Sequence, residues 1–189
     1  MSVATAPSEM TTEELLALPQ DGVDRWLIQG QLREKQMTVR NRVHSQIMAR
    51  VSQVLNNWLD QQPEPRGSIL CGEAGVRLRR NPDTTVGVDV VYVSAEVAAR
   101  QPDDTTLIDG VPVLVVEILS PNDTQEEINE KIDGYRRAGV ALVWVIDPHY
   151  RTVKIIRPKV EPELVNVRQE LDGEPELPGF RLAASQLFA

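Results

Sequence analysis

Long hydrophobic runs are absent from this sequence of 189 residues, and no stretch approaches the roughly 20 apolar residues that a membrane-spanning helix needs. The opening residues also lack the basic segment followed by an apolar block that marks a secretory signal. The chain holds a single cysteine, Cys71, so no disulfide can form within it. We therefore expect a cytoplasmic protein without membrane association, with Cys71 as a small strand residue that faces the core.

Basic residues are in the minority, since 20 lysines and arginines stand against 28 aspartates and glutamates, for a net charge of −8. This balance argues against a protein that coats nucleic acid non-specifically. Two basic clusters, "REKQMTVRNR" (33–42) and "RLRR" (77–80), could still form a phosphate-binding rim, or they could be solvated surface. The candidate nucleic-acid contacts within them are Arg33, Lys35, Arg40, Arg42, Arg79 and Arg80.

The first half of the chain alternates between helix and strand signals. The segment "TTEELLAL" (11–18) carries a capping box, which predicts a short helix. The segment "DRWLIQGQLRE" (24–34) predicts a hairpin around a Gln-Gly turn. Between 40 and 62, apolar residues recur every three or four positions, which predicts a long amphipathic helix. Strands are expected at 68–78 and 86–94.

The second half is predicted to add one helix between further strands. We expect a strand at 111–119, a capped helix at 122–139, and strands at 141–148, 151–158 and 163–171. This order of elements indicates the α/β class, with a central mixed β-sheet flanked by helices.

Two carboxylates interrupt strands that are otherwise aliphatic: Glu117 in "VLVVEIL" and Asp89 in "VGVDVVYV". Unbroken aliphatic strands are typical of sheets covered on both faces, where a carboxylate needs a partner or a bound ion. Two acids at the centre of a sheet repel each other unless a cation lies between them, and Mg²⁺ prefers carboxylate and carbonyl ligands. The alternative is that each acid pairs with an arginine or lysine from a covering helix.

Lys131 lies two turns into the helix that follows the strand of Glu117, with Glu127 and Tyr135 on the same helical face. Its ammonium group could reach back to Glu117 and stabilise negative charge that develops at a phosphodiester. Alternatively, Lys131 is half of an exposed ion pair with Glu127.

His44 and Glu73 are accessory candidates. His44 lies near the start of the long helix, where it could be a structural histidine or a contact at the edge of the site. Glu73 lies in the strand 68–78, and it reaches the same cleft only if it is on the inward face, because strand side chains alternate between faces.

The run of Asp89, "VEILSP", Lys131, Tyr135, "AGV" and "VWVIDP" resembles the Uma-two family, a branch of the PD-(D/E)XK nuclease superfamily. The likeness extends from "TTEELLAL" through "QGQL" and His44 to "LPGFRLAASQLF". It implies a single domain (1–189) with a restriction-endonuclease-like core, to which the helix and hairpin at about 11–36 and the strands at about 151–189 are extensions. It also implies a divalent-metal site on the strands of Asp89 and Glu117, and phosphodiester hydrolysis.

The chain departs from the family pattern at three positions. Val88 occupies the position before the first acid, where the pattern has a proline. Leu119 occupies the position where the superfamily carries a lysine, so Lys131 is the remaining candidate for that role. Trp26 occupies a position where many members carry a glutamate, and Glu34 is the nearby acid that could replace it.

These residues favour a Mg²⁺- or Mn²⁺-dependent endonuclease that hydrolyses phosphodiester bonds in DNA. Asp89, Glu117 and the Ile118 carbonyl would hold the metal, Lys131 would complete the catalytic set, and Tyr135 would be accessory. A homodimer is expected, since symmetric dimers are common. The alternative is a catalytically degenerate protein that acts as a dimeric binding or scaffold module. A third possibility is hydrolysis of another phosphate ester.

Overall fold

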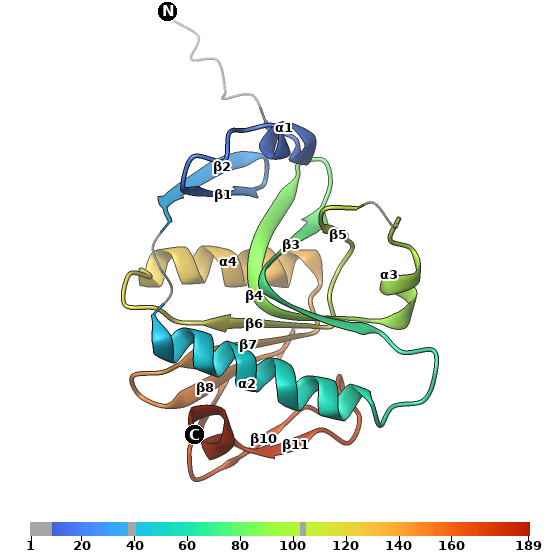
Figure 1. Ribbon diagram of the computed structural model, residues 1–189, viewed down its shortest axis with the longest axis vertical. Coiled ribbons are helices and arrows are strands. Elements are labelled where there is room, and N and C mark those ends of the chain that lie inside the picture. Colours follow the sequence, from blue (N-terminus) through green and yellow to red (C-terminus); the bar gives the residue numbers. More distant parts are fainter. Residues whose placement is uncertain (1–8, 38–40, 103–104) are drawn as a thin grey trace, which may run out of the picture.

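The computed structural model describes residues 9–37, 41–102 and 105–189 (Figure 1). The predicted α/β class with a central mixed sheet flanked by helices is confirmed. Within the described ranges, every helix is too short or too polar to cross a membrane.

Nine strands form the main sheet. They are β1 (Val23–Ile28), β2 (Gln31–Gln36), β3 (Ser68–Arg79), β4 (Thr84–Val93), β5 (Ile108–Asp109), β6 (Leu114–Ile118), β7 (Leu142–Asp147), β8 (Thr152–Ile156) and β9 (Glu163–Asn166). Their order is β2-β1-β4-β6-β7-β8-β9, while β3 pairs with β4 and β5 pairs with β3. The pairs β6–β7 and β3–β5 are parallel and the other pairs are antiparallel.

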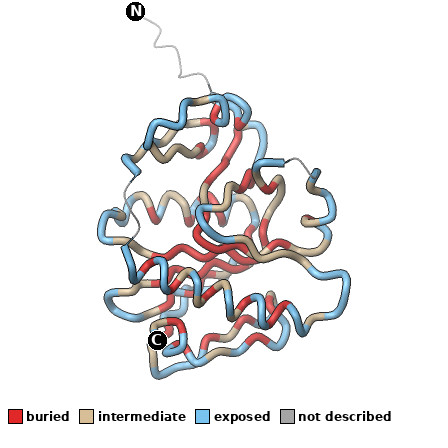
Figure 2. The backbone as a smooth tube through the Cα atoms, viewed as in Figure 1, coloured by how far each residue is buried: buried red, intermediate tan, exposed pale blue. Residues whose placement is uncertain are grey.

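Two helices, α2 (Arg42–Leu59) and α4 (Gln125–Ala138), cover opposite faces of this sheet. Successive strand residues face opposite sides, so Val116 packs in the core beneath α2 and Val115 packs in the core beneath α4. Figure 2 shows the buried residues gathered in the strands between the two helices. The remaining elements are α1 (Thr12–Leu16), α3 (Ala95–Ala99), the 3-10 helix η1 (Ala184–Phe188) and the pair β10 (Glu170–Asp172) and β11 (Arg181–Ala183).

Capping residues fix where α2 and α4 begin. The Asn41 side chain accepts a hydrogen bond of 2.9 Å from the backbone N–H of His44, which places His44 in the first turn of α2. Thr124 and Glu127 form a capping box at the start of α4. Gly139 ends α4 with a φ of +90°, a conformation that glycine adopts without the steric penalty of a side chain.

Two sequence predictions are wrong. The strand expected at 163–171 is divided into β9 and β10, because Gln169 donates its backbone N–H to the Asn166 carbonyl at 3.0 Å and closes a turn between them. Cys71 is exposed and does not face the core. The reason is a β-bulge between Cys71 and Ala74, with positive φ at Gly72 and Glu73, that interrupts the regular alternation of β3.

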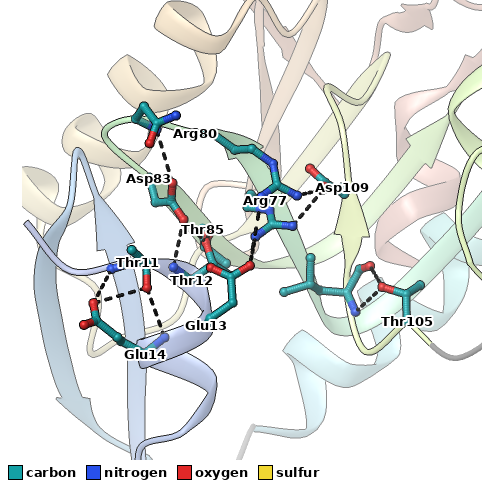
Figure 3. A network of polar contacts seen from close by, with 12 residues as sticks. Thr11, Thr12, Glu13, Glu14, Arg77, Arg80, Asp83, Thr85, Thr105 and Asp109 are labelled. Atoms are coloured by element: carbon teal, nitrogen blue, oxygen red, sulfur yellow. Dashed lines mark hydrogen bonds and ion pairs between the residues drawn. The ribbon is translucent and has the colours of Figure 1, made fainter.

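A polar network anchors α1 to the β3–β4 hairpin (Figure 3). Thr12 is fully buried, and its N–H and hydroxyl donate to Asp83 Oδ2 at 2.8 and 2.6 Å. Arg77 donates to Glu13 at 2.6 Å and to Asp109 at 2.7 Å. The short helix therefore has a fixed place on the sheet although it has only five residues.

Asp83→Asn is expected to lower the unfolding free energy at neutral pH by about 1–3 kcal/mol, because Asp83 is a buried charged acceptor. Burial raises the pKa of Asp83, but the hydrogen bonds from Thr12 and Asn81 outweigh this effect. The pKa of Asp83 therefore lies below the usual 3.8. Because the pKa of Asp83 is lower in the folded than in the unfolded protein, its ionised carboxylate stabilises the fold above pH 3.8. This stabilisation is lost as the pH falls through the pKa of the folded protein. Urea unfolding should therefore show the difference between wild type and variant shrinking in acid. A constant difference would contradict this assignment.

Candidate active site

One edge of β4 meets two different partner strands and leaves a gap between them. Thr85 pairs with Leu27 of β1, and Val90 pairs with Val116 of β6. Among the described residues, no strand partner is recorded on this edge for positions 86–89. The next step of the β4–β6 register would place Asp89 opposite Glu117. Both carboxylates therefore lie where the two strands separate.

Asp89 is held on both of its oxygens. Its Oδ2 accepts a hydrogen bond of 2.7 Å from the backbone N–H of Ile118, and its Oδ1 lies 3.2 Å from His44 Nε2. Asp89 is 4% exposed and His44 is 1% exposed. The N–H and carbonyl of a strand residue point to the same side, so the Ile118 carbonyl also faces the Asp89 side of β6.

Glu117 takes its partners from α4. Lys131 Nζ lies 3.2 and 3.1 Å from the two carboxylate oxygens of Glu117, and it also donates to the Gly87 carbonyl at 3.3 Å. The Tyr135 hydroxyl donates a short hydrogen bond to Glu117 Oε1. Lys131 and Tyr135 are four residues apart and so share one face of the helix. The helix thus directs a cation and a hydroxyl at the same buried carboxylate.

Burial and neighbouring charges both shift protonation in this cluster. Burial raises the pKa of Glu117, and the charge of Asp89 raises it further, against the opposing effect of Lys131. Burial alone would lower the pKa of Lys131, but the carboxylates of Glu117 and Asp89 raise it overall. Burial and the Glu117 charge raise the pKa of Tyr135 well above its usual value, so its hydroxyl stays a donor. The Glu117 carboxyl and the Lys131 ammonium therefore both have raised pKa values.

These groups open into a cleft of about 590 Å³. Asp89, Glu117, Ile118 and Lys131 line it, together with Glu73. His44 and Tyr135 are buried behind the two acids. The structure therefore brings together the acids, the lysine, the Ile118 backbone and three of the accessory candidates.

Glu34 is not in this cluster. It pairs with Arg25 at 2.8 Å, on the face of the hairpin away from α4. The neighbouring residues Arg33 and Lys35 turn toward α4, where Arg33 meets Glu130 and Lys35 meets Glu127. Because strand side chains alternate, Glu34 must face the other way.

Among the described residues, one of the six basic candidates lines the cleft. Of the six basic candidates, Lys35 lines the cleft, where it is neutralised by Asp123 at 3.1 Å and Glu127 at 3.0 Å. Arg80 lies elsewhere, paired with Asp109, and Arg79 is exposed on the same hairpin. The other three are Arg33, which is paired outside the cleft lining, Arg42, which is exposed at the start of α2, and Arg40, which lies outside the described residues.

Sequence reasoning missed Gly87, whose carbonyl accepts a hydrogen bond from Lys131. The available signal was a glycine inside a strand, "VGVDV", since such a glycine often marks close approach by another group. Gly87 pairs with Gly75 of β3, and both line the cleft. A Cβ on Gly87 would lie 3.0 Å from Glu73 Oε2.

The acids alone do not form a complete metal cage. Within the described residues, no three side chains of histidine, cysteine, aspartate or glutamate are grouped so that they could hold a metal ion. Asp89 and Glu117 with the Ile118 carbonyl make an open, all-oxygen set. Mg²⁺ usually retains several waters and takes one or two protein carboxylates, so this set suits Mg²⁺ or Mn²⁺ and does not suit zinc.

Comparisons with known proteins agree with this architecture. A family model described as "Putative restriction endonuclease", that of the Uma-two family, matches residues 12–185. The fold is similar to the crystal structure of "a putative nuclease belonging to DUF820" from Anabaena variabilis, with a TM-score of 0.77 at 22% identity, over 95% of this chain and 97% of that chain. A search of curated proteins gave no significant match.

Proposed function

The chain belongs to the Uma-two family of "putative restriction endonucleases", and we propose that it hydrolyses phosphodiester bonds of nucleic acid with a divalent metal at Asp89 and Glu117. The observation that supports this best is the buried cluster of two acids with Lys131 at a break in the sheet. Nearby positive charge offsets only part of the energetic cost of burying these two carboxylates. Their burial is therefore more easily explained by a role in function than by a role in stability.

The residues fit a divalent cation. Two buried carboxylates lie where β4 and β6 separate, and Lys131 contacts Glu117. Burial and the charge of Asp89 raise the pKa of Glu117, and a bound cation would offset both effects. Asp89, Glu117 and the Ile118 carbonyl would hold Mg²⁺ or Mn²⁺. When bound, such an ion polarises a phosphoryl oxygen and activates water for attack.

The other residues would orient these groups and supply positive charge. Lys131 would stabilise negative charge that develops on the phosphoryl group, because its ammonium is held at the cleft by Glu117 and the Gly87 carbonyl. His44 and the Ile118 N–H would fix the rotamer of Asp89. Tyr135 would do the same for Glu117.

Calorimetric titration with Mn²⁺ or Mg²⁺ tests the proposal. Wild type is expected to give a saturable isotherm, and Glu117→Gln is expected to lose it. Glu176→Gln is the matched control, because Glu176 also pairs with a cation, Arg157, at 2.9 Å, but it is remote from the cleft lining. The metal-loaded protein should cleave nucleic acid, and a chelator should stop the reaction. A wild-type protein without a saturable isotherm would favour the degenerate scaffold module.

A further inference from the structure

The lining of the cleft includes apolar side chains as well as acids. They are Leu15 and Leu16 of α1, Pro19, Trp26 of β1 and Leu107. Leu16 is 55% exposed and Met37, also at the cleft, is 60% exposed. Solvent-exposed apolar side chains grouped around a cleft are typical of a binding surface.

The charged residues of the cleft are mostly acidic. Its lining holds six carboxylates and three cationic side chains, Arg25, Lys35 and Lys131. Each of these cations is already paired: Arg25 with Asp21, Lys35 with Glu127 and Lys131 with Glu117. Duplex DNA is bound chiefly by neutralising many phosphates along its backbone. Within the described residues, this lining offers little unpaired positive charge for that purpose.

Two paired glycines, Gly75 of β3 and Gly87 of β4, line the cleft, with Glu73 and Leu107 close beside them. The Gly87 carbonyl accepts from Lys131, which in turn contacts Glu117. A group bound at this part of the cleft therefore lies next to the acids. The cleft volume of about 590 Å³ is within the range of pockets for single small ligands, roughly 300–1,000 Å³.

We propose that this cleft takes an unpaired nucleotide of single-stranded nucleic acid, with its base against the apolar side chains of the lining and its phosphate at Lys131 and the acids. This inference rests on the proposed function, since the acids and Lys131 locate the phosphate. Stacking of one base on an aromatic side chain contributes about 1–3 kcal/mol, and Trp26 provides such a side chain at the cleft. A paired base has no access to such a pocket unless it is extruded from the duplex.

Fluorescence anisotropy with labelled oligothymidylate, alone and annealed to its complement, tests this in Mg²⁺. A Glu117→Gln background keeps the probe intact. The single strand should bind about tenfold more tightly than the duplex, as expected for stacking of one base. Leu16→Asp should weaken single-strand binding roughly three- to tenfold, because it places a charge among the apolar side chains of the lining. Trp26→Ala should weaken it about tenfold.

Val160→Asp is the matched control, since Val160 is 63% exposed and remote from the cleft lining, and it should leave binding unchanged. Equal or tighter binding of the duplex, no binding of the single strand, or equal effects of Leu16→Asp and Val160→Asp would overturn the inference. Cleavage by wild type separates the two proposals. If wild type cleaves the duplex but not the single strand, the inference of an unpaired nucleotide is rejected and the proposed hydrolysis stands. If the single strand binds in a way that depends on Leu16 but wild type cleaves neither probe, the proposed hydrolysis is rejected and the inference of an unpaired nucleotide stands.

Discussion

Lys131→Met is expected to lower the rate of metal-dependent phosphodiester cleavage by about 10²–10³-fold, the usual cost of removing one group that stabilises transition-state charge. Methionine keeps the apolar stem and removes the ammonium that lies 3.1 Å from Glu117 Oε2. Substrate binding should change less than the rate, because the lost interaction forms mainly at the transition state. Single-turnover cleavage measures this effect.

The same substitution should also destabilise the metal-free protein at neutral pH, by about 1–3 kcal/mol, since it leaves the buried Glu117 carboxylate without its cation. Burial already raises the pKa of Glu117 above the usual 4.5, and loss of Lys131 would raise it further. When the pKa of an acid is higher in the folded protein than in the unfolded one, the acid contributes most to the unfolding free energy below pH 4.5. That contribution is lost as the pH rises through the pKa of the folded protein. The destabilisation should therefore shrink toward pH 4.5.

Lys154→Met is the matched control, because Lys154 is exposed on β8. It should change neither cleavage nor the unfolding free energy. A Lys131→Met protein that cleaves at the wild-type rate would show that Lys131 is a structural partner of Glu117 alone.

Local sequence patterns predicted most of the fold. Three- and four-residue spacing of apolar residues predicted α2, and capping residues predicted α1 and α4. The two acids stand out because they interrupt aliphatic strands, and the spacing of Lys131 and Tyr135 puts them on one helical face. These signals are all local, which is why they can be read without knowing the tertiary structure.

Pairings between distant segments could not be predicted. Nothing in the sequence around Arg77 indicates that it pairs with Glu13, and the pairing of Lys35 with Glu127 depends on how the hairpin sits against α4. For Lys131, the sequence left two alternatives, a contact with Glu117 or an exposed ion pair with Glu127, and the structure shows the contact with Glu117 at 3.1 Å. The sequence could not decide between them, because the contact depends on how α4 packs on the sheet.

Asp89→Asn is expected to reduce cleavage to the background rate while changing the unfolding free energy of the metal-free protein by less than about 1 kcal/mol. Asparagine can still accept from the Ile118 N–H, and its amide can donate to His44 Nε2 once the proton of His44 moves to Nδ1. That nitrogen is buried and has no partner among the described residues, which is the main cost of the substitution. Loss of the Asp89 charge also removes its repulsion of Glu117. If Asp89 were only a structural partner of His44, the variant would lose stability instead.

Asp83→Asn, directly before β4, should have the opposite effects on stability and cleavage. Asp83 is also a buried acid, 7% exposed, but its partners are Thr12 and Asn81 on the α1 side. Its variant should lose stability and keep cleavage. Together the two substitutions separate a carboxylate that holds the fold from one that serves the reaction.

The most direct test of the catalytic assignment is the initial cleavage rate of labelled nucleic acid, single-stranded and duplex, in Mn²⁺. Wild type, Asp83→Asn and Asp89→Asn are compared below their unfolding temperatures. We expect wild type and Asp83→Asn to cleave at similar rates and Asp89→Asn to cleave no faster than a chelator-treated sample. Equal rates for Asp89→Asn and wild type, or no cleavage by wild type on either substrate, would contradict the assignment of this site to phosphodiester hydrolysis.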